Sequence, residues 1–300
     1  MQDHPPLHIT SPSNPKVKDM ARLRQRSHRD AAGALLIEGY REIKRALDNG
    51  YRPWRLVTCA DFFMGSNETQ LIARCVAAEA VHMTCTPPVF EKISARDRPD
   101  GLLAVGPQIH RTLAGLTLPP NALVIVAEAI EKPGNLGTIL RSADAAGAAA
   151  VIVCDSCTDV QNPNVVRASI GTLFALPVVT ASSAEAVVYL RERGFRILAA
   201  TPHADAFYSD YDLTGNTAVI VGAEQYGLSD IWLDPGVTTP VRIPMLGQCD
   251  SLNVASATTI LLYEAVRQRV AKDRSMVPSP HAHEVGGDDP HGGSFRGGDR

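Results

Sequence analysis

The second half of the chain is dominated by short, nearly continuous apolar runs, and no other feature restricts the fold as strongly. Most of these runs are followed by a helical pattern of roughly 8–14 residues. Apolarity that does not alternate indicates strands buried on both faces, which is typical of a parallel sheet covered by helices. The sequence therefore predicts an α/β domain. The runs are ALVIVAEA (122–129), AAAVIVC (148–154), LPVVTA (176–181), RILAAT (196–201) and AVIVGAE (218–224).

Helix ends in this half support the interpretation. Ser182 or Ser183 suits the start of a helix that stops at Gly194. A last helix is predicted from about Asn253 to Lys272, with one apolar stripe formed by Val254, Ala257, Leu261 and Ala265.

The first third of the chain predicts a smaller α/β unit. A Ser/Asn/Pro turn leads into a basic helix, and ALLIE is followed by a helix from about Gly39 to Asp48. The segments WRLVTC, VHMTC and GLLAVG read as further strands. We expect a first domain over residues 1–105, a proline-containing linker over 106–120, a second domain over 121–272 and a disordered, Gly- and His-rich tail over 273–300.

Charge is distributed unevenly between the two halves. The net charge is −3, but residues 1–118 carry 16 basic and 12 acidic side chains, whereas residues 119–272 carry 10 and 15. A polyanion such as RNA would therefore dock on the N-terminal part, although a solvated basic helix face explains the same cluster equally well. The candidate RNA-binding residues are Lys16, Lys18, Arg22, Arg24, Arg26 and Arg29.

Several protein classes do not fit the sequence. The longest apolar runs are far shorter than the roughly 18 residues of a membrane span, and the first residues do not form a signal peptide. We therefore expect a cytoplasmic protein without membrane contact. The six cysteines are scattered, and the lone pair Cys154–Cys157 lacks a second pair for zinc, so we expect reduced thiols and no metal site. Neither a G-x-G-x-x-G loop nor a P-loop lysine is present.

Three loops that follow apolar strands could carry chemistry. In the first, Asn135 is placed to begin a helix that stops at Gly147, and its buried stripe would leave Arg141 facing away from the core. Taken alone, Asn135 is a helix cap and Arg141 a solvent-exposed arginine. The predicted stripe is Leu136, Ile139, Leu140 and Ala143.

The second and third loops add a carboxylate, a glycine at which a ligand can approach the backbone closely, and an apolar wall. Gly222 and Glu224 follow a strand directly, at the sheet edge where α/β proteins bind ligands. In the third loop, Ser251 and Asn253 stand at a helix start with free N–H groups. Ile243, Met245 and Leu252 could wall an apolar pocket suited to an adenine. An ordinary turn and a capping pair remain alternatives for these loops.

In this order the three loops closely resemble the motifs of the SpoU/TrmH branch of the SPOUT RNA methyltransferases. The matching patterns are N-x-G-x-x-x-R-S from Asn135, V-G-x-E-x-x-G-L-S from Val221, and I-P-M-x-G-x-x-x-S-L-N-V-A-x-A from Ile243. The resemblance covers roughly residues 119–270. The region before it is similar to the ribosomal-protein-like substrate-binding domain of many members that act on ribosomal RNA. Thiostrepton- and avilamycin-resistance enzymes belong to the same group, so the role could be housekeeping or resistance.

The resemblance implies a trefoil-knotted catalytic domain, a homodimer with shared active sites, and S-adenosylmethionine as cofactor. It implies that Gly222, Ile243, Met245 and Leu252 contact the cofactor. The implied catalytic cluster is Asn135, Arg141, Glu224, Ser251 and Asn253. The implied reaction is methyl transfer to a ribose 2′-hydroxyl of RNA, with ribosomal RNA favoured.

The role of Arg141 follows from its chemistry. An arginine with a pKa above about 12 is a poor general base. Stabilising a developing 2′-alkoxide, or gripping a phosphate, is electrostatically easier. Alternatives for the whole chain are a transfer RNA 2′-O-methyltransferase, a non-catalytic RNA-binding ribosome-assembly protein on the same fold, a methyltransferase for bases or small molecules, and a nucleotide-binding oxidoreductase, which the missing glycine motif disfavours.

Overall fold

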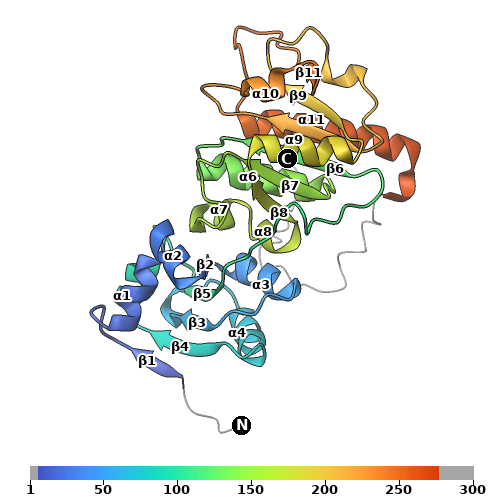
Figure 1. Cartoon of the computed structure of the whole chain (residues 1–300). Coiled ribbons are helices and arrows are strands. Elements are labelled where there is room, and N and C mark those ends of the chain that lie inside the picture. The colour runs from blue at the N-terminus through green and yellow to red at the C-terminus, as the bar shows by residue number, and fades with distance from the viewer. Residues whose placement is uncertain (1–5, 277–300) are drawn as a thin grey trace, which may run out of the picture.

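The computed structural model describes residues 6–276, and its chain forms two β-sheets, one after the other (Figure 1). Of the tail predicted over 273–300, Arg274–Met276 forms a short 3₁₀ turn, and the part from residue 277 onward lies outside the described residues. The first sheet has the strand order β1-β4-β3-β5-β2, with β5 antiparallel to both of its neighbours. Its strands are β1 (Leu7–Ile9), β2 (Ala34–Glu38), β3 (Arg55–Thr58), β4 (Val81–Cys85) and β5 (Leu102–Pro107).

Helices cover both faces of this first sheet. The pair α1 and α5 packs on one face, and the pair α3 and α4 on the other. The predicted basic helix is in fact two helices, because the chain turns at residues 23–25. The helices are α1 (Pro15–Arg22), α2 (Arg26–Ala32), α3 (Tyr40–Asp48), α4 (Glu68–Ala77) and α5 (Pro87–Ile93), with a short 3₁₀ turn, η1 (Ala60–Phe62).

The second sheet is parallel throughout, as the apolar runs predict. Its order is β11-β9-β10-β6-β7-β8. Every residue of β6, β7 and β10 is buried, which explains why their sequences do not alternate. The strands are β6 (Leu123–Glu128), β7 (Ala150–Cys154), β8 (Val178–Ala181), β9 (Arg196–Ala200), β10 (Thr217–Val221) and β11 (Thr239–Val241).

Two layers of helices enclose the second sheet. Alternate residues of β6 and β10 point to α6, α7 and α11 on one side and to α9 and α10 on the other. The predicted cap of α9 is confirmed, since Ser182 and Glu185 form a capping box. The helices are α6 (Pro133–Ala145), α7 (Pro163–Ala168), α8 (Thr172–Ala175), α9 (Ser183–Glu192), α10 (Asp230–Leu233) and α11 (Val254–Lys272), with the 3₁₀ turns η2 (Tyr208–Asp210) and η3 (Arg274–Met276). None of these helices within residues 6–276 is long and apolar enough to cross a bilayer.

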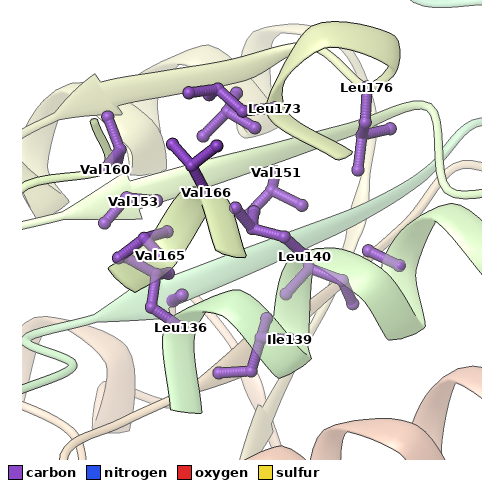
Figure 2. Packing of buried hydrophobic residues seen from close by; sticks show 14 of the residues in the cluster. Leu136, Ile139, Leu140, Val151, Val153, Val160, Val165, Val166, Leu173 and Leu176 are labelled. Carbon is purple, nitrogen blue, oxygen red and sulfur yellow. The ribbon is translucent and has the colours of Figure 1, made fainter. Parts of the chain in front are cut away.

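Helix α6 packs closely against α7 and carries the buried stripe predicted for it. Leu136, Ile139 and Leu140 point into the core beside Val165 and Val166 of α7 (Figure 2). The close approach requires a glycine at position 137, because a Cβ there would lie 2.4 Å from the Cβ of Ala168. On α11 the buried stripe is wider than predicted: Ala255, Thr258 and Leu262 are buried in addition, whereas Ala257 is only half-buried.

The two sheets share one continuous apolar core. The face of the first sheet that carries α3 and α4 belongs to the same buried cluster as α6, α7 and α11. Residues 106–120 are anchored as well, because the hydroxyl of Tyr189 donates to the carbonyl oxygen of Leu116 at 3.0 Å and Arg111 donates to that of Leu176 at 2.8 Å. The two parts are therefore held in one arrangement.

A buried carboxyl group in the first part makes stability depend on pH. Glu42 is 6% exposed and accepts a hydrogen bond from Arg96 at 2.9 Å, yet burial raises the pKa of Glu42 to about 7. Above the carboxyl's unfolded pKa, the folded state keeps a proton that the unfolded chain has lost. The free energy of unfolding should therefore fall as pH rises towards 7, by about 2–3 kcal/mol from this group.

Urea unfolding of the wild type and of Glu42→Gln at pH 5 and pH 7.5 measures this contribution. We expect the wild type to lose more stability than the variant between the two pH values. Glu38, whose pKa is also raised by burial, is present in both proteins, so only its coupling to Glu42 differs between them. Equal losses in the two proteins would contradict the assignment to Glu42.

Candidate active site at the carboxyl ends of the central strands

Three loops meet where the central strands of the parallel sheet end. Strands β6 and β10 are neighbours in register, so the loops that leave their carboxyl ends start side by side. The β6 loop enters α6, the β10 loop holds residues 222–229, and the segment after β11 leads into α11, which packs on α6. This arrangement agrees with the expectation that all three motifs lie at one edge of the sheet.

The carboxylate of Glu224 is the centre of a polar cluster. Its Oε1 accepts hydrogen bonds from Asn135 Nδ2 and Asn253 Nδ2, both at 2.7 Å. Asn253 Nδ2 also donates to Asn135 Oδ1 at 3.2 Å, and the Lys132 ammonium forms an ion pair with Glu224 Oε2. The cluster thus joins one side chain from each of the three loops, and adds a lysine that we did not single out from the sequence.

Charge in the cluster is fixed by these contacts. The Lys132 ammonium, followed by the two amides, holds the pKa of Glu224 below its usual range, and Glu224 in turn raises the pKa of Lys132. Glu224 is therefore a hydrogen-bond acceptor. Its carboxylate, together with the Asn135 amide oxygen, fixes the orientation of the amide groups that donate to them. The cavity lined by Lys132, Asn135 and Glu224 is about 10 Å³, which is room for about one water molecule and too small for a substrate.

Two residues of the cluster lie at or near the start of a helix. Asn253 is the N-cap of α11, as predicted, with its Oδ1 accepting from the N–H groups of Ala255 and Ser256 at 3.1 and 3.4 Å. The prediction that Asn135 begins α6 is wrong by two residues. The helix starts at Pro133 with Lys132 as its N-cap, because proline is preferred at the first helical position. This shift leaves the Asn135 side chain free to bind Glu224.

The loop after β10 is a tight turn. Ala223 and Gly227 exchange backbone hydrogen bonds at 3.0 and 2.9 Å, and Gly227 has a φ of +68°. A Cβ on Gly222 would lie 2.3 Å from the carbonyl oxygen of Gly227. Only glycine therefore fits at position 222.

The third loop presents apolar side chains to solvent. Leu246 is 97% exposed and Leu252 is 40% exposed, while Ile243 packs partly into the core and Met245 is half-buried. Exposed apolar groups in an otherwise polar loop are suited to a flat apolar ligand such as an adenine ring. The residues present thus fit S-adenosylmethionine.

Two predicted catalytic residues lie apart from the cluster. Ser251 is exposed, and its hydroxyl donates to Asp250 at 3.2 Å. Arg141 is exposed, as predicted, and within residues 6–276 its side chain makes no hydrogen bond or ion pair. It follows Asn135 by six residues, which advance about 9 Å and turn about 240° along a helix. Arg141 therefore faces away from the cluster of its own chain.

A second carboxylate, missed in the sequence, ties the site to the sheet. Glu128, at the end of β6, is 3% exposed and accepts hydrogen bonds from Ser183 Oγ and the Ser229 backbone N–H, both at 2.9 Å. Trp232 Nε1 donates to Ser183 Oγ at 2.9 Å and completes the network. Glu128 thus anchors the turn after β10. An acidic residue at the end of an apolar strand is the signal that could have revealed it.

The predicted RNA-binding residues separate into an exposed group and one buried residue. Lys16, Lys18, Arg22, Arg24 and Arg26 are exposed along α1 and the start of α2. Arg29 is not, with an exposed fraction of 1%, because it pairs with Asp159 of the second part of the chain. The prediction that Arg29 contacts RNA is therefore wrong, because its side chain is buried in an ion pair with Asp159.

Two family models match the chain. The SpoU rRNA methylase family matches residues 122–263, and the MRM3-like substrate binding domain matches residues 14–104. The first match contains the Glu224 cluster, and the second contains the exposed basic residues.

Curated and solved relatives agree with this division. The chain is 34% identical over 267 residues to a 23S rRNA (uridine(2479)-2′-O)-methyltransferase of Streptomyces viridochromogenes, covering 86% of this chain and 91% of that protein. A crystal structure of an RNA 2′-O ribose methyltransferase is 42% identical, with a TM-score of 0.78 and coverage of 88% and 100%. An AdoMet-bound rRNA methyltransferase from Sinorhizobium meliloti is 32% identical, with a TM-score of 0.78 and coverage of 87% and 97%.

These similarities confirm the predicted fold class, an α/β SPOUT-type domain with a parallel sheet behind a small α/β domain. They also extend over both parts of the chain, so the family assignment does not rest on the catalytic motifs alone. The chain belongs to the SpoU family of RNA methyltransferases.

Proposed function

We propose that this protein transfers a methyl group from S-adenosylmethionine to a ribose 2′-hydroxyl of ribosomal RNA. The observation that carries the proposal is the Glu224 carboxylate, held by Asn135, Asn253 and Lys132 from loops at one sheet edge. The relatives named above, whose names state 2′-O-methylation of RNA, support the same reaction.

Residues of the second and third loops hold the cofactor in this proposal. Gly222, Ile243, Met245 and Leu252 form its binding surface, through backbone groups and the apolar side chains of the loop. When bound, S-adenosylmethionine supplies an electrophilic methyl group on a sulfonium. The negative charge of Glu224, and the Asn135 and Asn253 amides that it fixes, would orient polar groups of the ligands bound beside them.

Arg141 acts on the RNA hydroxyl. Its guanidinium stays protonated, so it stabilises the negative charge that develops on the 2′-oxygen, or grips the neighbouring phosphate. Ser251, whose hydroxyl is exposed near the α11 start, would hydrogen-bond the ribose or Arg141.

A homodimer brings Arg141 to the cluster of the other subunit. The distance and rotation between Asn135 and Arg141 along α6 support action across an interface. Exposed apolar side chains on α11 support the same assembly, since Ile260 and Tyr263 are 37% and 49% exposed.

The N-terminal part, residues 1–105, serves as the RNA-binding domain, and residues 121–272 as the catalytic domain. The exposed cations Lys16, Lys18, Arg22, Arg24 and Arg26 would neutralise phosphates of the RNA.

Mapping of 2′-O-methyl sites tests the proposed function. Ribosomal and transfer RNA from cells with and without the gene are compared nucleotide by nucleotide. We expect one ribose in ribosomal RNA to lose its methyl group when the gene is absent. Loss of a transfer RNA site instead would replace the proposed substrate, and an unchanged map for both RNAs would contradict the proposal.

A further inference from the structure

The junction between the two parts of the chain is built around a buried arginine. Arg29 of α2 donates hydrogen bonds to the carbonyl oxygens of Leu23 and Arg24, both at 2.9 Å, and pairs with Asp159, which precedes α7. Farther along the junction, Arg45 of α3 donates to Thr172 Oγ1 at 2.9 Å. The Arg29 contacts tie the turn between α1 and α2 to the segment that precedes α7.

A groove of about 430 Å³ opens at this corner, and both parts of the chain line it. Its volume lies within the range of about 300–1,000 Å³ that is usual for ligand sites. The first part contributes Arg24, Glu91 and residues 94–97, and the second part contributes residues 162–164. The groove exists only because the two parts are docked.

The walls of the groove are ordered by hydrogen bonds. Ser94 Oγ and the Ala95 N–H both donate to the buried carboxylate of Glu38, the second at 2.8 Å. Arg24 is held by Nη1 donating to the Ser94 carbonyl oxygen at 3.1 Å and by Nε donating to that of Ala21 at 3.2 Å. A ligand would therefore meet a surface that needs little rearrangement.

Polar groups of both kinds remain available in this surface. Arg24 Nη2 and the Asn164 side-chain amide make no hydrogen bond within residues 6–276, and Asn162 uses only its Oδ1, which accepts from the Asn164 N–H at 2.9 Å. The Glu91 and Asp97 carboxylates line the same groove as acceptors. Donors beside carboxylates disfavour a phosphate and suit the edge of a nucleobase, which presents both donors and acceptors.

The exposed basic residues of α1 lead along the chain to Arg24, which lines the groove. They are Lys16, Lys18 and Arg22, and Arg26 begins α2. Phosphate contacts on such a surface position an RNA but do not select its sequence. A polar groove beside it could supply that selection, since proteins read RNA sequence mainly on unpaired bases.

We propose that the groove between α1, the 94–97 loop and the start of α7 binds one unpaired nucleotide of the substrate RNA, distinct from the methylated one. This inference rests on the proposed function, because it takes RNA as the substrate. It makes the groove a determinant of which RNA segment is chosen.

Asn164→Asp tests the proposal by adding a carboxylate to the groove without changing side-chain size. Gln70→Glu adds the same charge on α4, which covers the other face of the first sheet, and is the matched control. The probe is a full-length 23S ribosomal RNA transcript. We expect Asn164→Asp to raise the dissociation constant for this RNA about 10-fold, with no such change for Gln70→Glu. The dissociation constant for S-adenosylhomocysteine should be the same in all three proteins.

Cross-linking provides a second measurement. A transcript that contains 4-thiouridine is irradiated with the wild-type protein, and we expect a cross-linked peptide that includes residues 162–167. Equal RNA affinity of Asn164→Asp and Gln70→Glu, or cross-links confined to other segments, would overturn the groove proposal. If the wild type methylates the transcript in that case, the proposed function stands without it. Failure of the wild type to bind S-adenosylhomocysteine would instead count against the proposed function itself.

Discussion

Arg141→Ala should abolish methyl transfer while leaving cofactor affinity unchanged. Arg141 is exposed, contacts no residue of the Glu224 cluster and is the cation that we assign to the RNA 2′-oxygen. Loss of a preorganised donor of this kind reduces the rate by about 100- to 1,000-fold or more. Tritium transfer from labelled S-adenosylmethionine to RNA measures the rate, and calorimetry with S-adenosylhomocysteine measures the affinity.

Arg191→Ala is the matched control, because Arg191 is an exposed arginine on α9, which covers the opposite face of the sheet. We expect it to retain wild-type activity. An Arg141→Ala protein that still methylates RNA at the wild-type rate would contradict the role of Arg141. A variant that also loses the cofactor would place Arg141 in cofactor binding instead.

Mixed dimers decide whether Arg141 acts across the interface. Arg141→Ala and Asn135→Ala subunits should each be inactive alone. When the two are co-expressed with different tags, a mixed dimer has one site with both residues intact if Arg141 serves the partner subunit. Random assembly would then recover roughly a quarter of wild-type activity. No recovery in purified mixed dimers would contradict action across the interface.

The second large effect is expected for Gly222→Ala, which should remove cofactor binding and lower stability. The added Cβ would lie 2.3 Å from the Gly227 carbonyl oxygen and 2.8 Å from the Leu228 nitrogen. Both are backbone atoms, so the turn itself must open. Such overpacking costs about 1–3 kcal/mol or more. We expect at least a roughly 100-fold weaker affinity for S-adenosylhomocysteine, which corresponds to about 2.7 kcal/mol.

Gly215→Ala controls for the substitution itself. A Cβ at Gly215 meets no atom within 4 Å, and its φ is not in the left-handed region. We expect it to bind the cofactor normally and to melt at or slightly above the wild-type temperature. Thermal melting and calorimetry on both variants make the comparison. Wild-type affinity in Gly222→Ala would contradict the proposed place of this turn in the cofactor site.

Features of the fold that depend on local sequence could be predicted. The buried strands of the second sheet follow from runs such as 123–128, and the capping box at Ser182 follows from its own four residues. The start of α6 could also have been placed correctly, since proline at position 133 favours the first helical position. By contrast, β1 and β11 have three residues each and form only by pairing with distant strands, so their sequences give no signal of their own.

The candidate site shows the same limit. The order of strands and loops was enough to bring Asn135, Glu224 and Asn253 together. The burial of Arg29 could not be predicted, because it depends on Asp159, 130 residues away in the sequence. The ion pair of Lys132 with Glu224 likewise depends on the meeting of two loops. Strand order predicts which loops meet at the sheet edge, but it does not predict individual ion pairs such as these two.

Methyl transfer by the purified protein tests the central claim most directly. The protein is incubated with S-adenosylmethionine labelled in its methyl group and with ribosomal RNA, and the RNA is then digested to nucleosides. We expect the label in a single 2′-O-methylnucleoside, and none when Arg141→Ala replaces the wild type. Label on a base, or no label in any RNA from a protein that binds S-adenosylhomocysteine, would contradict the assignment of ribose methylation.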